Sequence, residues 1–430
     1  MSADGHHTVT RRTTVHLRQR PRLAVLCAVT VASLLALPLV WHHLAGRGIV
    51  GTFRFADFGV YWSTANDWLD GQAIYDIEDP FGNYLYPPVY LLAFVPFASW
   101  FGWPVAAEAW IVLSVGLLWL GLNALVWTYV PSLRTAERFA LAAGSLVLLV
   151  GFHPILYGIR LGQASIIVAA IVTAAVVAME RDRPDRRWLA VVSGALTAVG
   201  GTVKLFYAPV GAHLLLDRVR LVAAVVAGVL LAAASIAVFG LETNLDYLHV
   251  LAWGEDWGTD PAHPSWGWIP GYYRPLYGLT DLHPLLALIA RLGVVLGIIA
   301  IALWVRDAGA DREVFALGIV AIPLVGPQVS THDLAVVLPA IVILAAVEVR
   351  RDGHVWLPVL ALLLFHWQAY VTFGVANVPD WIPFSAAIID ASPWLQPGLY
   401  GNVALMALAV HRALEHRPPR WYHRNRSQSG

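Results

Sequence analysis

The sequence is short of charged residues and has almost no cysteine. Charged residues make up 13% of the 430 positions, against about 25% in soluble domains, so an ordinary soluble domain is excluded. Cys27 is the only cysteine, which rules out a disulfide within the chain. The formal net charge is zero, and this balance predicts no nucleic-acid partner.

Hydrophobic sequence is plentiful instead, at 58% of the chain, and it occurs in long unbroken runs. The alternation typical of a β-barrel is missing, whereas about 20 consecutive apolar residues span a bilayer as a helix. We therefore predict an all-α polytopic membrane protein with about twelve transmembrane helices and short outer-face helices and loops. The 19 tryptophans suit the membrane interfaces. The predicted crossings are residues 23–43, 105–129, 138–156, 162–179, 188–203, 205–217, 221–239, 284–305, 314–328, 334–348, 355–373 and 398–413.

Two segments depart from this pattern, and two tails flank it. Residues 88–101 are too short to span and are bracketed by prolines, which favours a re-entrant or interfacial segment. The stretch "GGTVK" at 200–204 predicts a helix break. The transmembrane domain is predicted at 23–413, between a disordered basic tail at 1–22 and a second basic tail at 414–430. The first apolar run is too long for a signal peptide, so we expect a retained helix.

Positive charge is unevenly distributed among the predicted loops. With the N-terminus inside the cell, 22 of the 28 Lys and Arg residues fall in the tails and cytoplasmic loops, as the positive-inside rule requires. We therefore predict a multi-pass plasma-membrane protein with both termini cytoplasmic. The cations left outside this pattern are Arg47, Arg54, Arg160, Arg274, Arg291 and the chain's single lysine, Lys204.

The predicted outer face gathers a carboxylate and several cations. Lysine binds phosphate as a point charge and arginine binds it bidentately, while a carboxylate can take a proton from a hydroxyl group. Such a set suits glycosyl transfer from a phosphate-activated sugar at the outer face. Its members are Asp57 in "FADFGVYW", Arg160, Gln163, Lys204, Arg274 and His332.

Each of these residues also has a purely structural interpretation. Asp57 can be a solvated or capping residue, and Lys204 can extend from a helix end toward the membrane surface. Ser330 and Thr331 can cap a helix that begins at Asp333, next to His332. Arg160 can anchor a turn at 157–161, and an aromatic belt accounts for Trp266 and Tyr273. The functional interpretation depends on the convergence of these residues on one face.

Four motifs, in this order, resemble glycosyltransferase family 87, the integral-membrane transferases that use polyprenol-phosphate mannose and have the GT-C fold. "ADFGVYW", followed by "LDGQAIYD" and "YPP", resembles the first outer loop of the family. "YGIRLGQAS" at 157–165 resembles its Gly-Gln motif, and "GALTAVGGTVKLFYAP" at 194–209 resembles its Gly-rich helix leading to Lys and Pro. "STHDLAVVLP" at 330–339 resembles its late His-containing turn. The resemblance spans about residues 50–345.

The resemblance implies an α-mannosyltransferase that inverts the sugar configuration. Its catalytic acid falls on Asp57, as general base, its Gly-Gln on Gly162 and Gln163, its lysine on Lys204 and its histidine on His332. The implied phosphate-binding residues are Lys204, His332, Arg160 and Arg274, and the implied substrate-binding residues are Gln163, Tyr61, Tyr86, Trp266 and Tyr273. This chain departs from the family at Ser165, where members commonly have Asn, and the contacts of this position with donor or acceptor are therefore open.

The implied partners are a polyprenyl-phosphate sugar donor, a glycolipid acceptor of the phosphatidylinositol mannoside or lipomannan type, and membrane lipids. An α-1,2 linkage is implied. No cofactor and no metal are expected, because a monophosphate facing several cations has little need of a metal ion. The alternatives are a related transferase for another polyprenyl-phosphate sugar such as arabinofuranose, a lipid-linked sugar transporter, and an assembly subunit without chemistry. The sequence does not predict the oligomeric state.

Overall fold

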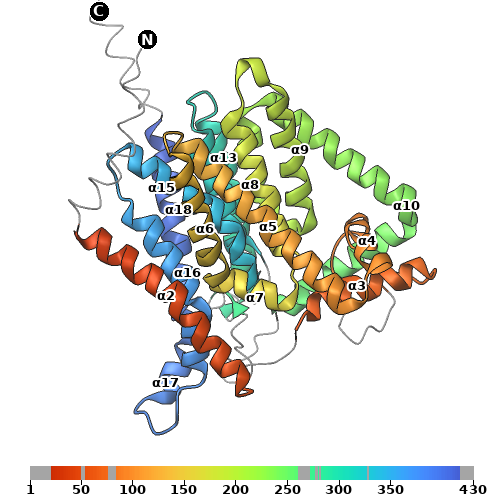
Figure 1. Ribbon diagram of the computed structural model, residues 1–430. Coiled ribbons are helices and arrows are strands. Elements are labelled where there is room, and N and C mark those ends of the chain that lie inside the picture. Colours follow the sequence, from red (N-terminus) through yellow and green to blue (C-terminus); the bar gives the residue numbers. More distant parts are fainter. Residues whose placement is uncertain are drawn as a thin grey trace, which may run out of the picture.

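The computed structural model describes residues 21–49, 54–75, 84–259, 272–276, 279, 282–326 and 329–416. These residues form an all-α polytopic fold with one two-stranded antiparallel sheet (Figure 1). The first half contains α2 (Pro21–Gly46), α3 (Ala56–Leu69), η2 (Pro88–Ala93), α4 (Val95–Trp100), α5 (Trp103–Tyr129), α6 (Thr135–Gly151), α7 (His153–Leu161), α8 (Ser165–Arg181), η3 (Pro184–Arg186), α9 (Trp188–Val203) and η4 (Leu205–Leu216). The second half contains α10 (Arg218–Thr259), β1 (Tyr272–Tyr273), α13 (Pro284–Trp304), α14 (Asp311–Val325), β2 (Val329–Ser330), η5 (Thr331–Val337), α15 (Leu338–Arg350), α16 (Trp356–Ala376), α17 (Ser385–Asp390), η6 (Ser392–Trp394) and α18 (Pro397–Glu415).

Every predicted crossing is mostly helical in its described residues, but not all are long enough to span a bilayer alone. Within the described residues, six helices have the required length and apolar composition. These are α2, α5, α10 as far as Leu251, α13, the η5–α15 pair and α16. The helices α6 and α7, bent by 69° at their junction, would make a seventh span. By contrast, α8, α9, η4 and α14 have 17, 16, 12 and 15 residues.

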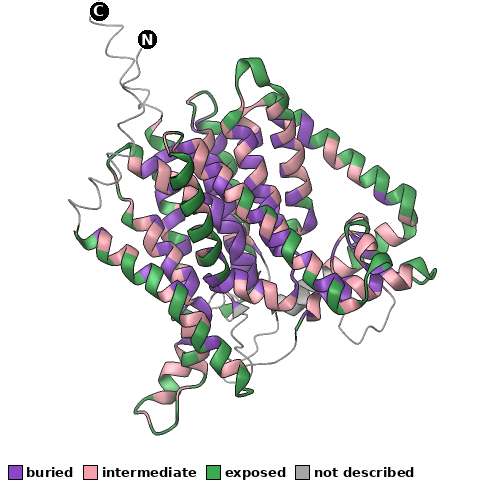
Figure 2. Ribbon diagram, in the orientation of Figure 1, coloured by how far each residue is buried: buried purple, intermediate pink, exposed green. Residues whose placement is uncertain are grey.

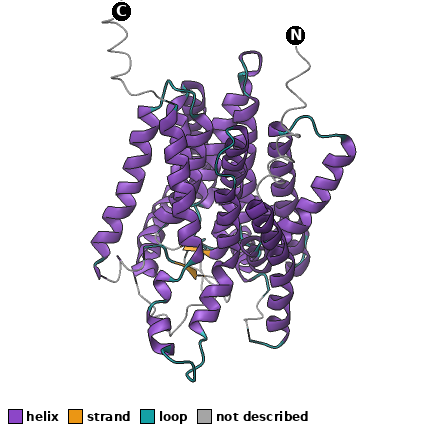
Figure 3. Cartoon of the chain, turned by 90° about the vertical axis from the view of Figure 1, so that its left-hand side faces the viewer, coloured by secondary structure: helices purple, strands orange, loops and turns teal. Residues whose placement is uncertain are grey.

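The short helices occupy the core of the bundle, and the long apolar helices surround them. Nearly every residue of α14 is buried, as are most of α8 and of the η5–α15 pair. Large apolar side chains of α2, α10 and α13 are exposed, as lipid-facing positions must be (Figure 2). The sheet of β1 and β2 lies within the bundle, toward its lower end in Figure 3.

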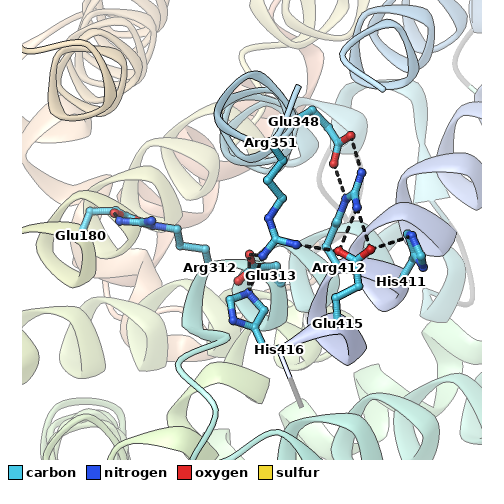
Figure 4. Close-up of polar contacts among 9 residues, drawn as sticks. All are labelled: Glu180, Arg312, Glu313, Glu348, Arg351, His411, Arg412, Glu415 and His416. Carbon is cyan, nitrogen blue, oxygen red and sulfur yellow. Dashed lines mark hydrogen bonds and ion pairs between the residues drawn. The ribbon is translucent and has the colours of Figure 1, made fainter. Parts of the chain in front are cut away.

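One end of the bundle is held together by ion pairs, which we call the arginine cluster (Figure 4). Arg312 of α14 binds Glu180 of α8 at 2.6 Å, and Arg412 of α18 binds Glu348 of α15 at 2.5 Å. Further contacts join these helix ends to one another. The cluster consists of Glu180, Arg312, Glu313, Glu348, Arg351, His411, Arg412, Glu415 and His416. The cluster therefore joins the ends of α8, α14, α15 and α18.

Two local predictions of structure need correction or refinement. Residues 157–161, expected to be a turn, form the last turns of α7, because Gly162 (φ 70°) ends that helix one residue later. The segment 88–101 forms η2 and α4, two short helices beside α3 near the lower right of Figure 1. The expected helix break is present, since α9 ends at Val203 and Lys204 has extended backbone angles.

Candidate active site

The first turn of α3 carries Asp57, and contacts with α7 fix where that turn lies. Phe55 precedes the helix with a left-handed backbone (φ 62°), and its N–H donates to the carbonyl of Arg160 at 2.7 Å. Gly162 lies so close to α3 that a Cβ atom there would stand 2.5 Å from the Cβ of Phe58. These contacts hold α3 against the end of α7 and bring Asp57 beside the residue that follows Gly162.

That residue, Gln163, links Asp57 to two tyrosines. Its Nε2 donates to Asp57 Oδ2 at 2.5 Å. Its Oε1 accepts from the hydroxyls of Tyr61 and Tyr86 at 2.6 and 2.8 Å and from the N–H of Ala164 at 2.8 Å. Because three donors converge on Oε1, the amide is oriented with its N–H toward the carboxylate. Tyr61 and Tyr86, predicted to bind substrate, thus hold Gln163 in place with their hydroxyls.

A second polar group surrounds Asp333, a buried acid. Lys204 Nζ donates to its Oδ1 at 2.9 Å, and the hydroxyl of Tyr207 donates to the same oxygen at 3.0 Å. The N–H of Ser330 donates to Oδ2 at 3.1 Å, and His332 Nε2 stands 3.6 Å from that oxygen. The lysine predicted to bind phosphate and the predicted histidine therefore share one carboxylate.

The two groups meet through Tyr86. Lys204 Nζ lies 5.6 Å from the centre of the Tyr86 ring, whose hydroxyl binds Gln163.

Burial raises the pKa of Asp57 to about 6, although the nearby Lys204 charge and the Gln163 hydrogen bond oppose the increase and the Asp333 charge adds to it. A carboxylate with this pKa is ionised at neutral pH and is suited to act as a general base.

The two predicted arginines, Arg160 and Arg274, make different contacts. The carbonyl of Arg160 holds the start of α3, and its side chain is half-buried near Tyr157. Arg274 follows β1, and its backbone N–H and carbonyl bind the side-chain amide of Gln396 at 2.8 and 2.7 Å. Both arginines therefore have structural contacts, and their predicted contact with phosphate stays a prediction.

Two further aromatic residues, Tyr273 and Trp266, were predicted to bind substrate. Tyr273 is fully buried and pairs with Val329 across the sheet, which places β1 against the turn that carries His332. Its ring lies against the backbone at Gly398. Trp266 lies outside the described residues. Among the described residues, no group of three or more His, Cys, Asp or Glu side chains is placed to hold a metal ion.

Two residues of this constellation, Asp333 and Tyr207, were not predicted from the sequence. The motif "STHD" drew attention to His332, and Asp333 was expected only to begin a helix. Instead Asp333 is the residue on which Lys204, Tyr207 and His332 converge. The sequence did contain a signal for this pairing. A buried lysine needs a counter-ion, and Asp333 is an acid at the start of an apolar run, where it is a candidate partner for Lys204.

Comparison with known proteins shows the family of the chain. The model of glycosyltransferase family 87 matches residues 84–327, more than half of the chain. The chain belongs to glycosyltransferase family 87. Its membership and its apolar helices identify it as a membrane glycosyltransferase. No curated protein and no solved structure matches the chain. The matched region of family 87 includes Tyr86, Gln163 and Lys204, whereas Asp57 and His332 lie outside it.

Proposed function

We propose that this family 87 protein transfers mannose from polyprenyl-phosphate mannose to a lipid-linked mannoside, with inversion and with Asp57 as the general base. The acceptor is of the phosphatidylinositol mannoside or lipomannan type, and the linkage formed is α-1,2. The observation that carries the proposal is the Asp57 carboxylate, bound by Gln163 at 2.5 Å and close enough to Lys204 for the lysine charge to lower its pKa. A base and a cation suited to phosphate thus occupy one site.

The reaction has a single displacement step. The acceptor hydroxyl oxygen attacks the anomeric carbon of mannose and its proton passes to Asp57, while the bond between that carbon and the phosphate oxygen breaks. Gln163 donates to Oδ2, and in this scheme Oδ1 takes the proton. Polyprenyl phosphate leaves with an additional negative charge, which Lys204 and His332, with Arg160 and Arg274, stabilise. General-base assistance typically contributes about 10²–10⁴-fold.

The proposed location follows from the two ends of the bundle. The arginine cluster marks one end, and the helix break at Lys204 lies at the other end of α9. Because arginine favours the cytoplasmic side, we assign the arginine cluster and both tails to the cytoplasm and the Asp57 site to the outer face of the plasma membrane. Donor and acceptor lipids then reach the site within the outer leaflet, with Gln163, Tyr61, Tyr86, Trp266 and Tyr273 as substrate-binding candidates.

The test compares purified wild-type protein with Asp57→Asn in transfer of labelled mannose from synthetic polyprenyl-phosphate mannose to a lipid-linked mannoside. Asn keeps the size of the side chain but cannot accept the proton, so we expect a loss of about 10²-fold or more. Asp70→Asn, an exposed change at the end of the same helix, is the matched control and retains activity. Full activity in Asp57→Asn would assign the base to another residue.

A second candidate is transfer of another polyprenyl-phosphate sugar, such as arabinofuranose, because the same phosphate-binding residues fit either donor. Parallel assays with both donors separate the two. Binding of both donors without transfer of either sugar would instead favour a transporter of lipid-linked sugars.

A further inference from the structure

We infer that Asp333 is a positioning residue that holds Lys204 and His332 in the orientation needed to receive the donor phosphate. The inference rests on the proposed function, because it concerns the phosphate of the same substrate. Asp333 does not contact the sugar or the reacting atoms in this scheme. It acts through Lys204 and His332 beside it.

The carboxylate of Asp333 is itself rigidly held. Its side chain is 3% exposed. The hydroxyl of Tyr207 and the N–H of Ser330 donate to opposite oxygens, at 3.0 and 3.1 Å. Ser330 caps η5 and Asp333 accepts from it as the other half of the capping box, so the carboxylate is fixed by the backbone of the turn that also carries His332. A rigid anion of this kind can orient flexible cations.

Lys204 depends on this anion more than an arginine would. Its ammonium has three N–H donors on a flexible four-carbon chain, and Asp333 accepts one of them at 2.9 Å. The rings of Tyr86 and Phe206 lie 5.6 Å from Nζ, and these contacts carry little directional preference. The hydrogen bond to Asp333 therefore sets the direction of the other two N–H groups, which are the donors for a phosphate.

His332 is available for the same ligand. Its Nε2 faces Asp333 at 3.6 Å, while its Nδ1 is buried and has no hydrogen-bond partner among the described residues. Buried ring nitrogens usually have a hydrogen-bond partner, and a phosphate oxygen of the donor can be the partner of this one. The ring stacks on Tyr157 with 6.0 Å between centroids, which fixes its plane. Nδ1 is therefore the ring atom that can meet the phosphate.

The net charge of the site distinguishes a positioning role of Asp333 from a purely electrostatic effect. At neutral pH the charges of Asp57, Asp333 and Lys204 sum to −1, so the Asp333→Asn variant has a more positive site. If Asp333 affected the phosphate only by its charge, the variant would bind polyprenyl phosphate more tightly than the wild type. If Asp333 positions Lys204 and His332, the variant binds the anion more weakly despite the gain in positive charge, because the donors are no longer aligned.

The experiment measures binding of polyprenyl monophosphate and, separately, kcat and KM for mannosyl transfer, in wild type, Asp333→Asn and Tyr207→Phe. We expect Asp333→Asn to weaken polyprenyl phosphate binding about tenfold and to lower kcat about 10²-fold, with a smaller loss of the same kind in Tyr207→Phe. The control is Asp311→Asn, which removes an acid paired with Arg220 at 2.6 Å outside the site. Thermal unfolding identifies any variant that fails to fold, and Tyr207→Phe, which keeps the Lys204–Asp333 ion pair, then serves as the test.

The outcomes separate the two proposals. Asp333-dependent binding of polyprenyl phosphate, without mannosyl transfer by the wild type, would support the positioning role and overturn the proposed reaction. Mannosyl transfer by the wild type together with unchanged or tighter phosphate binding in Asp333→Asn would support the reaction and overturn the positioning role. Absence of polyprenyl phosphate binding by the wild type would overturn the positioning role.

Discussion

At the scale of single residues, the pKa of Asp57 gives a direct pH prediction. Burial raises that pKa to about 6, and the base must be ionised to take a proton. We therefore expect kcat/KM to be level above pH 7 and to fall about tenfold per pH unit below 6. The residual activity of Asp57→Asn should lack this acid limb. A wild-type limb near pH 4, the ordinary range of a solvated carboxyl group, would contradict the buried environment.

Gly162 provides a second prediction at this scale. Its backbone is left-handed (φ 70°), and a Cβ atom there would stand 2.5 Å from that of Phe58 in α3. Gly162→Ala must push α3 away and move Asp57 from Gln163, so we expect a loss of transfer activity of at least tenfold, since small displacements of catalytic groups are costly. Activity measured alongside thermal unfolding checks this.

Gly71 supplies the matched control for that variant. Its backbone is also left-handed (φ 85°), but nothing lies within 4 Å of the position of its Cβ atom. Gly71→Ala therefore carries the backbone strain of about 1–2 kcal/mol without the collision. Equal activity losses in the two variants would mean that close packing of α3 and α7 does not position Asp57.

At the scale of elements, the arginine cluster joins α15 to α18 through buried ion pairs. Glu348 is fully buried, and Arg412 binds both of its oxygens, at 2.5 and 2.8 Å. Removing one partner of a buried ion pair typically costs about 3–5 kcal/mol, because the other charge stays buried without compensation. We expect Glu348→Gln to lower the thermal midpoint in detergent by several degrees.

The control for that prediction lies at the same end of the bundle. Asp185 and Arg186 form an ion pair at 3.5 Å, with both side chains mostly exposed, and exposed pairs contribute little. Asp185→Asn should leave the thermal midpoint unchanged within error. A midpoint for Glu348→Gln equal to that of the control would show that the cluster contributes nothing to holding α15 and α18 together.

Elements were predictable from the sequence to the extent that apolar runs define them. Each run became a helix, and the break at Lys204 was placed correctly because glycines and a lysine interrupt an apolar segment. The bend between α6 and α7 was not predicted, since His153 and Pro154 interrupt the run without changing its hydropathy much.

In the site, Asp57 and Gln163 were named together from the sequence. The pairing of Lys204 with Asp333 joins positions 129 residues apart, and periodicity carries no information about such contacts.

At the scale of the whole molecule, the proposed orientation is testable because the chain has a single cysteine. With Cys27 replaced by Ala, Gln72→Cys, just after α3, and Asp185→Cys, between α8 and α9, place exposed thiols at the two ends. We expect a membrane-impermeant maleimide to label Gln72→Cys in intact cells and Asp185→Cys only after the membrane is opened. The reverse pattern would invert the topology and place the Asp57 site in the cytoplasm.

The short central helices have a consequence for the lipid around the protein. At 1.5 Å per residue, α8 and α9 are about 26 and 24 Å long, whereas a hydrocarbon core is about 30 Å thick. Gln163 and Lys204, at the ends of these helices, therefore sit below the normal level of the headgroups unless the bilayer thins around them. The difference between the length of these helices and the thickness of the bilayer therefore affects how readily a lipid substrate reaches the site. In vesicles of increasing acyl-chain length, the phosphate of a lipid substrate would have to descend farther to reach the lysine.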